Sequence, residues 1–147
     1  MLDGLFETSG GLVPLVLRLG LAVVMFPHGA QKVLGWFGGH GVKGTLEFFR
    51  KTGIPTGFAL LAFAAEFLGP LGLAVGLLTR VAAFGIACVM LVAMAQVHWQ
   101  HGFFMNWSGS QPGEGFEYHV LALIIATALM ISGGGAWSLD GLLTGGR

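Results

Sequence analysis

Charge is the scarcest property of this sequence. Only 10% of its 147 residues are Asp, Glu, Lys or Arg, while 54% are hydrophobic and the mean hydropathy is +0.79. A soluble domain usually carries about 25% charged residues. A water-soluble fold of this length would lack the polar side chains to cover its surface, so we expect lipid to be its main solvent. The 7 basic and 7 acidic residues balance, which leaves no basic surface for nucleic acid.

Cysteine is nearly absent as well, since the chain contains only Cys88. A single cysteine excludes both an intrachain disulfide and a Cys-x-x-Cys redox pair. Any redox chemistry would therefore depend on a cofactor or on another subunit.

What the sequence has instead is long apolar runs, four of which approach the ~20 residues needed to cross a bilayer. They cover residues 12–32, 58–78, 81–97 and 116–132. Because short loops join most of them, they predict an all-α integral membrane protein, a single domain over residues 1–147 built as an antiparallel four-helix bundle. We expect a multi-pass protein of the inner (cytoplasmic) membrane whose main contact is the lipid bilayer.

The first run has a signal peptide as its alternative interpretation, which would require a basic start and a cleavage site after a short apolar core. Residues 1–11 carry Asp3 and Glu7 but no Lys or Arg, and the apolar run continues past the usual signal-peptide length. We therefore expect a retained transmembrane helix.

The loop 33–57 contains a short amphipathic segment, Thr45–Lys51, in which Leu and Phe alternate with charged residues. It predicts a short interfacial helix between the first and second helices. Basic residues number four on this side of the membrane and two on the other, which favours the cytoplasm for this loop. They are Lys32, Lys43, Arg50 and Lys51 on this side, and Arg80 and Arg147 on the other.

Small residues form a stripe along the second span, at Ala65, Gly69, Gly72 and Gly76. Small side chains let membrane helices approach closely. This stripe would serve helix packing either within one chain or between chains. The sequence is therefore compatible with both a monomer and a homo-oligomer.

Two charges interrupt the apolar runs, Arg18 in the first and Glu66 in the second. Ionisable groups inside a bilayer are costly and rarely persist without a partner or a function. Each lies well inside its span, so we predict that the two pair near mid-depth. The pair would be either a structural ion pair or the polar floor of a pocket, and both interpretations stay open.

Arg18, Met25 and Lys32 are seven residues apart and share one face of the first helix, which is the candidate for the bundle interior. His28 lies near this face. A histidine in such a position more often forms a structural hydrogen bond than binds a ligand. We expect Arg18, His28, Gln31 and Glu66 to line an intramembrane polar pocket.

A second polar cluster lies where the third span ends and the fourth begins, and it contains Gln96, His98, His101, Glu114, Glu117, Tyr118 and His119. His98, Glu117, Tyr118 and His119 are the candidates for the mouth of the pocket. His98 and His101 have the i, i+3 spacing that can hold a metal with Glu117 as a third ligand. Histidines anchored at the headgroup level are a more common arrangement than a metal site. A proton relay or a quinone-head site is the third interpretation, and it ranks between these two.

The chain resembles the DoxX family of membrane proteins over nearly its whole length. The resemblance is carried by Arg18-Leu-Gly20, Pro27-His28-Gly-Ala-Gln-Lys32, Gly35-Trp-Phe-Gly-Gly39, Glu66-Phe-Leu-Gly69, Gly76-Leu-Leu-Thr-Arg80, His98 with Gly102-Phe-Phe104, Gly115-Phe-Glu117-Tyr118 and Ser138-Leu-Asp140. It implies a small bacterial four-helix integral membrane protein. Some relatives are the membrane subunit of a thiosulfate:quinone oxidoreductase, and others associate with redox-stress or thiol-oxidation partners. Because that enzyme uses a second polypeptide, family membership predicts the architecture better than the reaction.

Three functions remain. The leading hypothesis is a membrane subunit of a redox system, in which quinone is the candidate ligand, a redox protein is the partner and the catalytic residues are unknown. The second is a non-enzymatic scaffold or small-solute permeation protein whose polar groups hold the helices together. The third is copper or zinc handling through His98, His101 and Glu117.

Overall fold

The computed structural model describes residues 11–145, and helices are the only regular secondary structure over that range. The first long helix is α2 (Val13–Val33), and the last is α7 (Glu117–Ser132). The second is continuous over α4 (Thr56–Phe63), η1 (Ala64–Leu68) and α5 (Gly69–Val75). The third is continuous over α6 (Thr79–Ala93), η2 (Met94–His98) and η3 (Trp99–His101). Two shorter helices are α3 (Gly41–Lys51) and α8 (Leu139–Leu143). Residues 1–10 and Arg147, used above in the signal-peptide and orientation arguments, lie outside the described residues.

The all-helical prediction is confirmed for the described residues, and the four expected helices are present with shifted ends. Val13–Val33, Thr56–Val75 and Thr79–His101 are each long and apolar enough to cross a membrane. α7 is apolar but shorter, with 16 residues. The second helix ends before residue 78 because Gly76 adopts a left-handed conformation (φ 70°), which terminates a helix at little cost when the residue is glycine.

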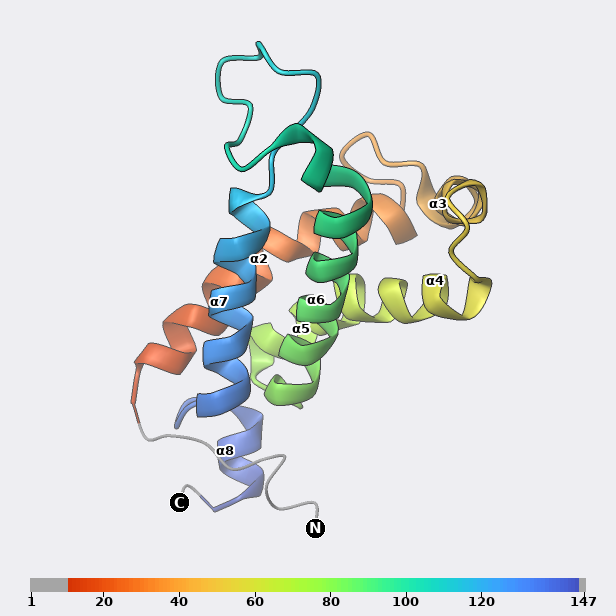
Figure 1. Cartoon of the computed structure of the whole chain (residues 1–147). Coiled ribbons are helices and arrows are strands. Elements are labelled where there is room, and N and C mark those ends of the chain that lie inside the picture. Colours follow the sequence, from red (N-terminus) through yellow and green to blue (C-terminus); the bar gives the residue numbers. More distant parts are fainter. Residues whose placement is uncertain (1–10, 146–147) are drawn as a thin grey trace.

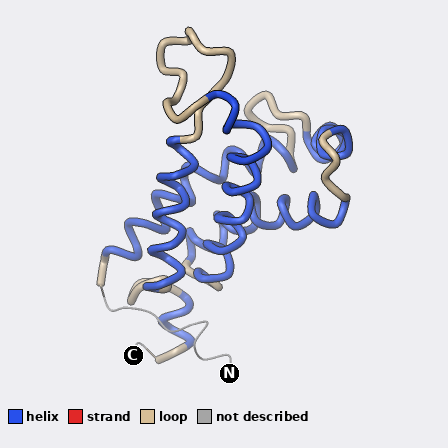
Figure 2. Tube along the Cα trace, in the orientation of Figure 1, coloured by secondary structure: helices blue, strands red, loops and turns tan. Residues whose placement is uncertain are grey.

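The helices pack around one apolar core, although a regular antiparallel bundle is not confirmed. Figure 1 shows α6 and α7 side by side, α2 crossing them obliquely, and α4 pointing away from them towards α3. The tube in Figure 2 shows the same arrangement, with the longest loops at the end of the molecule opposite the termini. The core joins α2, α5, α6 and α7 through Leu21, Met25, Leu73, Ile86 and Leu129, among others.

α3 occupies the place of the expected interfacial helix but begins earlier, at Gly41. The Thr45 hydroxyl donates a hydrogen bond to the Lys32 carbonyl oxygen (3.4 Å), which fastens α3 to the end of α2. The rings of Phe49 and Phe63 stack at 6.2 Å and fasten it to α4. These contacts hold α3 beside the helices, and its location at a membrane interface stays a prediction.

α2 meets the second helix at Gly29, which faces the Glu66 backbone in η1. A Cβ atom at Gly29 would overlap the Glu66 carbonyl group. Only glycine allows two helix backbones to approach this closely. The contact therefore sets the register of the two helices, with Glu66 level with the last turns of α2.

We expect Gly29→Ala to destabilise the protein by at least ~1–3 kcal/mol, because the added methyl group must push two backbones apart. Gly20→Ala is the matched control on the same helix, since a Cβ there meets nothing within 4 Å, and its effect should stay within about 1 kcal/mol. Thermal unfolding of both variants in a mild detergent measures the difference. Equal melting temperatures would contradict the close approach.

Candidate functional site

A cavity of about 300 Å³ lies among α2, η1, α6, η2 and α7, and the loop 102–116 forms part of its wall. The structure brings five of the eight expected site residues together there. They are His28, Glu66, His98, Tyr118 and His119. The remaining lining residues are Lys32, Val89, Met90, Ala93, Met105 and Glu114. The cavity thus combines ionisable groups with an apolar wall supplied by α6.

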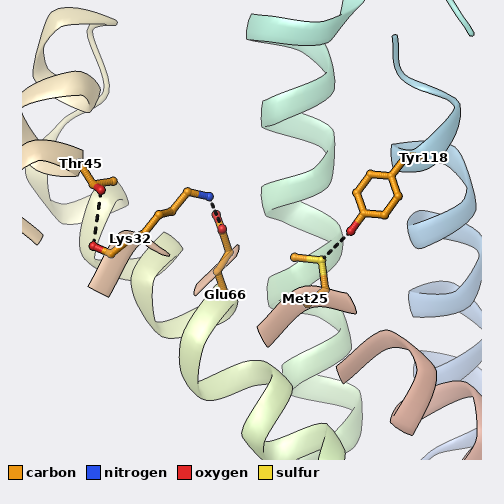
Figure 3. Close-up of polar contacts among 5 residues, drawn as sticks. All are labelled: Met25, Lys32, Thr45, Glu66 and Tyr118. Carbon is orange, nitrogen blue, oxygen red and sulfur yellow. Dashed lines mark hydrogen bonds and ion pairs between the residues drawn. The ribbon is translucent and has the colours of Figure 1, made fainter. Parts of the chain in front are cut away.

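Glu66 forms an ion pair with Lys32 rather than with Arg18 (Figure 3). Glu66 is 1% exposed, whereas the Lys32 side chain keeps 32% of its exposure. The predicted pair of Arg18 with Glu66 is therefore wrong. The contact at Gly29 places Glu66 near the C-terminal end of α2, and Arg18 is ~20 Å from Lys32 along the helix axis.

Arg18 is buried at the opposite end of α2, where its guanidinium donates to four backbone carbonyls. Two belong to α5, at Leu73 (2.9 Å) and Ala74 (2.6 Å). The other two follow α7, at Gly134 (3.0 Å) and Trp137. The planar guanidinium offers five donors in a fork, which suits several acceptors at once. Arg18 therefore joins three segments of the chain, and it does not line the cavity.

Asp140 in α8 connects this part of the protein to the start of α6. Its carboxylate accepts hydrogen bonds from the backbone N–H groups of Leu78 (2.7 Å) and Thr79 (2.8 Å), at the start of α6. A carboxylate at a helix N-terminus satisfies donors that have no partner within the helix. Sequence reasoning did not assign Asp140 a role, because its partners are backbone groups that only the tertiary structure brings near.

Two π-helical turns each supply one cavity residue. Glu66 lies within η1 and His98 is the last residue of η2. A π-helical turn inserts one additional residue, which redirects the side chains around it, and such turns are frequent at functional sites. Their occurrence on two helices that line the same cavity is an indication of function independent of residue type.

Two histidine rings lie against each other in the cavity wall. The centroids of His98 and His119 are 4.1 Å apart. Nδ1 of His98 is 2.8 Å from the Glu114 carbonyl oxygen and so holds the loop 102–116 against η2. His119 is 5% exposed, and its Nδ1 is buried without a hydrogen-bond partner among the described residues. A buried polar atom without a partner is costly, which makes His119 the group in this cavity with spare bonding capacity.

Tyr118 connects the cavity to the core. Its hydroxyl donates a weak hydrogen bond to the Met25 sulfur (3.3 Å), and Figure 3 shows the tyrosine pointing at that methionine. The ring of His28 lies 6.2 Å from the ring of Tyr118, at the more exposed edge of the cavity. Because a thioether is a poor acceptor, the Tyr118 hydroxyl can exchange this bond for a better one.

The structure leaves three expected site residues outside the cavity lining: Arg18, Gln31 and Glu117. The Gln31 side chain donates to the Phe37 carbonyl oxygen (3.2 Å), and Glu117 accepts from the Trp107 indole (3.2 Å). Within residues 11–145, no three His, Cys, Asp or Glu side chains are grouped to hold a metal ion. His98, His101 and Glu117 therefore do not form the metal site considered above.

Lys32 and Glu114 were not among the expected site residues, although Glu114 belongs to the polar cluster predicted between the third and fourth spans. The seven-residue spacing of Lys32 from Met25 placed it on the inner face of the first helix, and this signal could have found it. Glu114 and Met105 reach the cavity through the folding of the loop 102–116. That loop is closed by hydrogen bonds between Asn106 and both Glu114 and Gln111, a pattern the sequence does not reveal.

We expect Lys32→Met to destabilise the protein by ~3 kcal/mol, because it leaves the buried Glu66 carboxylate without its partner. Glu66→Gln should cost less, since the partly exposed Lys32 can turn to water. Combining Lys32→Met with Glu66→Leu should restore most of the loss, because a buried pair replaced by apolar groups is close to neutral. Thermal unfolding of the three variants tests this order, and an equal cost for both single changes would contradict it.

We expect Arg18→Met to lower stability by at least ~3 kcal/mol, because four backbone carbonyl oxygens lose their donor and two of these hydrogen bonds are buried. Arg50→Met, at an exposed position of α3, is the control and should stay within ~0.5 kcal/mol. The melting temperature in detergent measures both. A stable Arg18→Met variant would show that Arg18 is not needed to hold α2 against α5 and the segment after α7.

Comparison with known proteins gives a family for this chain. The DoxX family model matches residues 13–99, a segment that contains Lys32, Glu66 and His98. A protein of Bacillus subtilis (strain 168) named "Putative oxidoreductase CatD" is 26% identical over 133 residues, which cover 90% of this chain and 88% of the relative. No solved structure matches the chain. The expected resemblance is confirmed, and the chain belongs to the DoxX family.

Proposed function

We propose that this protein is the membrane component of a redox system and that its cavity binds the headgroup of a quinone. Membership of the DoxX family and the name of its relative CatD support a membrane protein associated with redox chemistry. The observation that carries the quinone proposal is that His119, which lines the cavity, has a buried Nδ1 without a partner among the described residues.

The chemistry of the cavity fits a quinone. A quinone headgroup is a flat ring with carbonyl oxygens that accept hydrogen bonds, and its tail is apolar. Ligand cavities measure ~300–1,000 Å³ and combine apolar walls with a few polar groups. At about 300 Å³, this cavity suits a headgroup rather than a whole lipid-soluble molecule. Val89, Met90 and Ala93 offer an apolar wall, and His119 and Tyr118 offer donors.

Each polar group has a distinct role in this proposal. His119 donates from Nδ1 to one carbonyl oxygen of the ring, which satisfies the buried atom. The His98 ring limits the movement of His119 by lying against it, and Glu114 holds His98 through its carbonyl oxygen. Tyr118 can move its hydroxyl hydrogen bond from the Met25 sulfur to the ligand.

Lys32 and Glu66 provide a route for protons. Glu66 is buried beside the cavity, and the Lys32 side chain bonded to it is exposed to 32%. An ion pair with one member buried and the other accessible can hold a proton at Glu66 Oε2 or at Lys32 Nζ. A bound quinone supplies redox chemistry that takes up two electrons and two protons, with the electrons coming from a partner redox protein. The pair therefore connects the cavity to the proton supply outside.

The test measures the binding of a short-tailed benzoquinone and a short-tailed naphthoquinone to the purified full chain in detergent. Binding is monitored by the change in tryptophan fluorescence. We expect His119→Phe to weaken binding by about fivefold to tenfold, since it keeps the ring against His98 but removes one hydrogen bond. His40→Phe makes the same change at an exposed position outside the cavity and should leave binding unchanged.

Absence of binding by the wild-type protein, or equal effects of the two substitutions, would refute the proposal. The non-enzymatic alternative makes a different prediction. A scaffold or permeation protein would bind neither quinone, and its function would survive any cavity substitution that preserves the fold.

A further inference from the structure

α3 presents a basic surface that the proposed function does not use. Its exposed charged side chains are Lys43, Arg50 and Lys51 against a single Glu47, a net charge of +2. Lys43 and Arg50 are seven residues apart and therefore lie almost in line along the helix. Thr45, on the opposite side, is buried against α2. The basic residues consequently face away from the protein.

The acidic residue on this face does not cancel the charge. Glu47 and Lys51 form an exposed ion pair at 2.9 Å. The hydrogen bond from the Lys51 ammonium, together with its charge, lowers the pKa of the Glu47 carboxyl. The charge of Arg50 lowers this pKa as well, but one carboxylate cannot neutralise three basic groups, so a net charge of +2 remains on the helix surface.

Exposed aromatic side chains occur on α3 and in the loop before it. Phe48 of α3 is 51% exposed, and Trp36 and Phe37 in the preceding loop are 54% and 63% exposed. Tryptophan and basic residues gather where a membrane meets water, with rings at headgroup level and cations near the phosphates. An acidic protein partner would explain the basic residues but would leave three exposed rings without a reason.

The direction of α3 agrees with such a location. Figure 1 shows α3 end-on, where it packs against α2 and α4, while α6 and α7 run along the plane of the same view. If α6 and α7 cross the bilayer, α3 therefore runs parallel to the membrane plane, the direction that a helix at the surface would have. Amphipathic helices with basic polar faces bind membranes in this orientation.

We propose that α3 and the loop before it form a binding surface for anionic phospholipid headgroups, with Lys43, Arg50 and Lys51 as the phosphate contacts and Trp36, Phe37 and Phe48 inserted at headgroup level. This surface does not depend on a ligand in the cavity. It adjoins the cavity wall, because Thr45 of α3 donates to the carbonyl oxygen of Lys32, whose side chain pairs with Glu66.

The experiment measures lipid preference for the full chain in proteoliposomes. Electron paramagnetic resonance compares the association of spin-labelled phosphatidylglycerol with that of spin-labelled phosphatidylcholine. We expect the wild type to prefer the anionic lipid by about fivefold, the contribution of roughly one basic residue near an anionic surface. The triple variant Lys43→Gln, Arg50→Gln, Lys51→Gln should bring the ratio close to one. These positions are exposed, so the variant should fold.

Two matched variants test the role of charge. The exchange Lys43→Arg, Arg50→Lys, Lys51→Arg keeps the charge and should keep the preference. Glu47→Gln removes the one acidic group on α3 and should raise the preference. Raising the ionic strength to 1 M should abolish it, because charges at the surface are then screened within ~3 Å. Inorganic phosphate at matched ionic strength should have no effect, since a free anion cannot insert with the aromatic side chains.

Four outcomes would overturn the proposal. They are a wild-type ratio near one, an unchanged ratio in the triple Gln variant, a lower ratio in Glu47→Gln, and competition by inorganic phosphate. A wild-type ratio near one would assign the basic surface to an acidic protein partner instead. None of these outcomes bears on quinone binding, so the two proposals can fail separately.

Discussion

The contact between Gly29 and the backbone of Glu66 constrains the rest of the structure. Because no side chain separates the two helices there, their register cannot slide without a clash. This register places Glu66 beside Lys32, whose ammonium compensates the buried carboxylate. It also places Gly76 and the end of α5 level with Arg18, whose guanidinium lies close to Gly76. A single close approach thus determines the environment of both intramembrane charges.

The two charges serve different purposes, although their sequence contexts are alike. Arg18 donates to carbonyls on α5 and after α7, so its bonding capacity is used within the fold. Glu66 lies beside a cavity and bonds to a lysine that retains access to the outside. An ionisable residue in an apolar helix therefore indicates a site only where a cavity and spare bonding capacity accompany it.

The cavity and α3 carry the two proposals made for this protein, a quinone site and a surface for anionic lipid. Family membership supports a membrane redox role but does not define a reaction, because function depends on the site rather than on the fold. The cavity has an apolar wall and is lined by His119, whose Nδ1 is buried without a partner among the described residues, and the quinone proposal rests on this combination. α3 adjoins this cavity through Thr45 and Lys32 and faces outward with basic and aromatic side chains.

The sequence by itself determined the helical class, the approximate limits of the long helices, the family and the gathering of polar residues near His98 and His119. Apolar run length and composition carry this information locally, without reference to distant residues. Only the tertiary structure decided which charges meet. Partners such as Lys32 for Glu66 depend on helix register, and the carbonyls around Arg18 are backbone groups that every sequence contains. The reach of Glu114 into the cavity depends in turn on how the loop 102–116 closes, which local residue patterns do not encode.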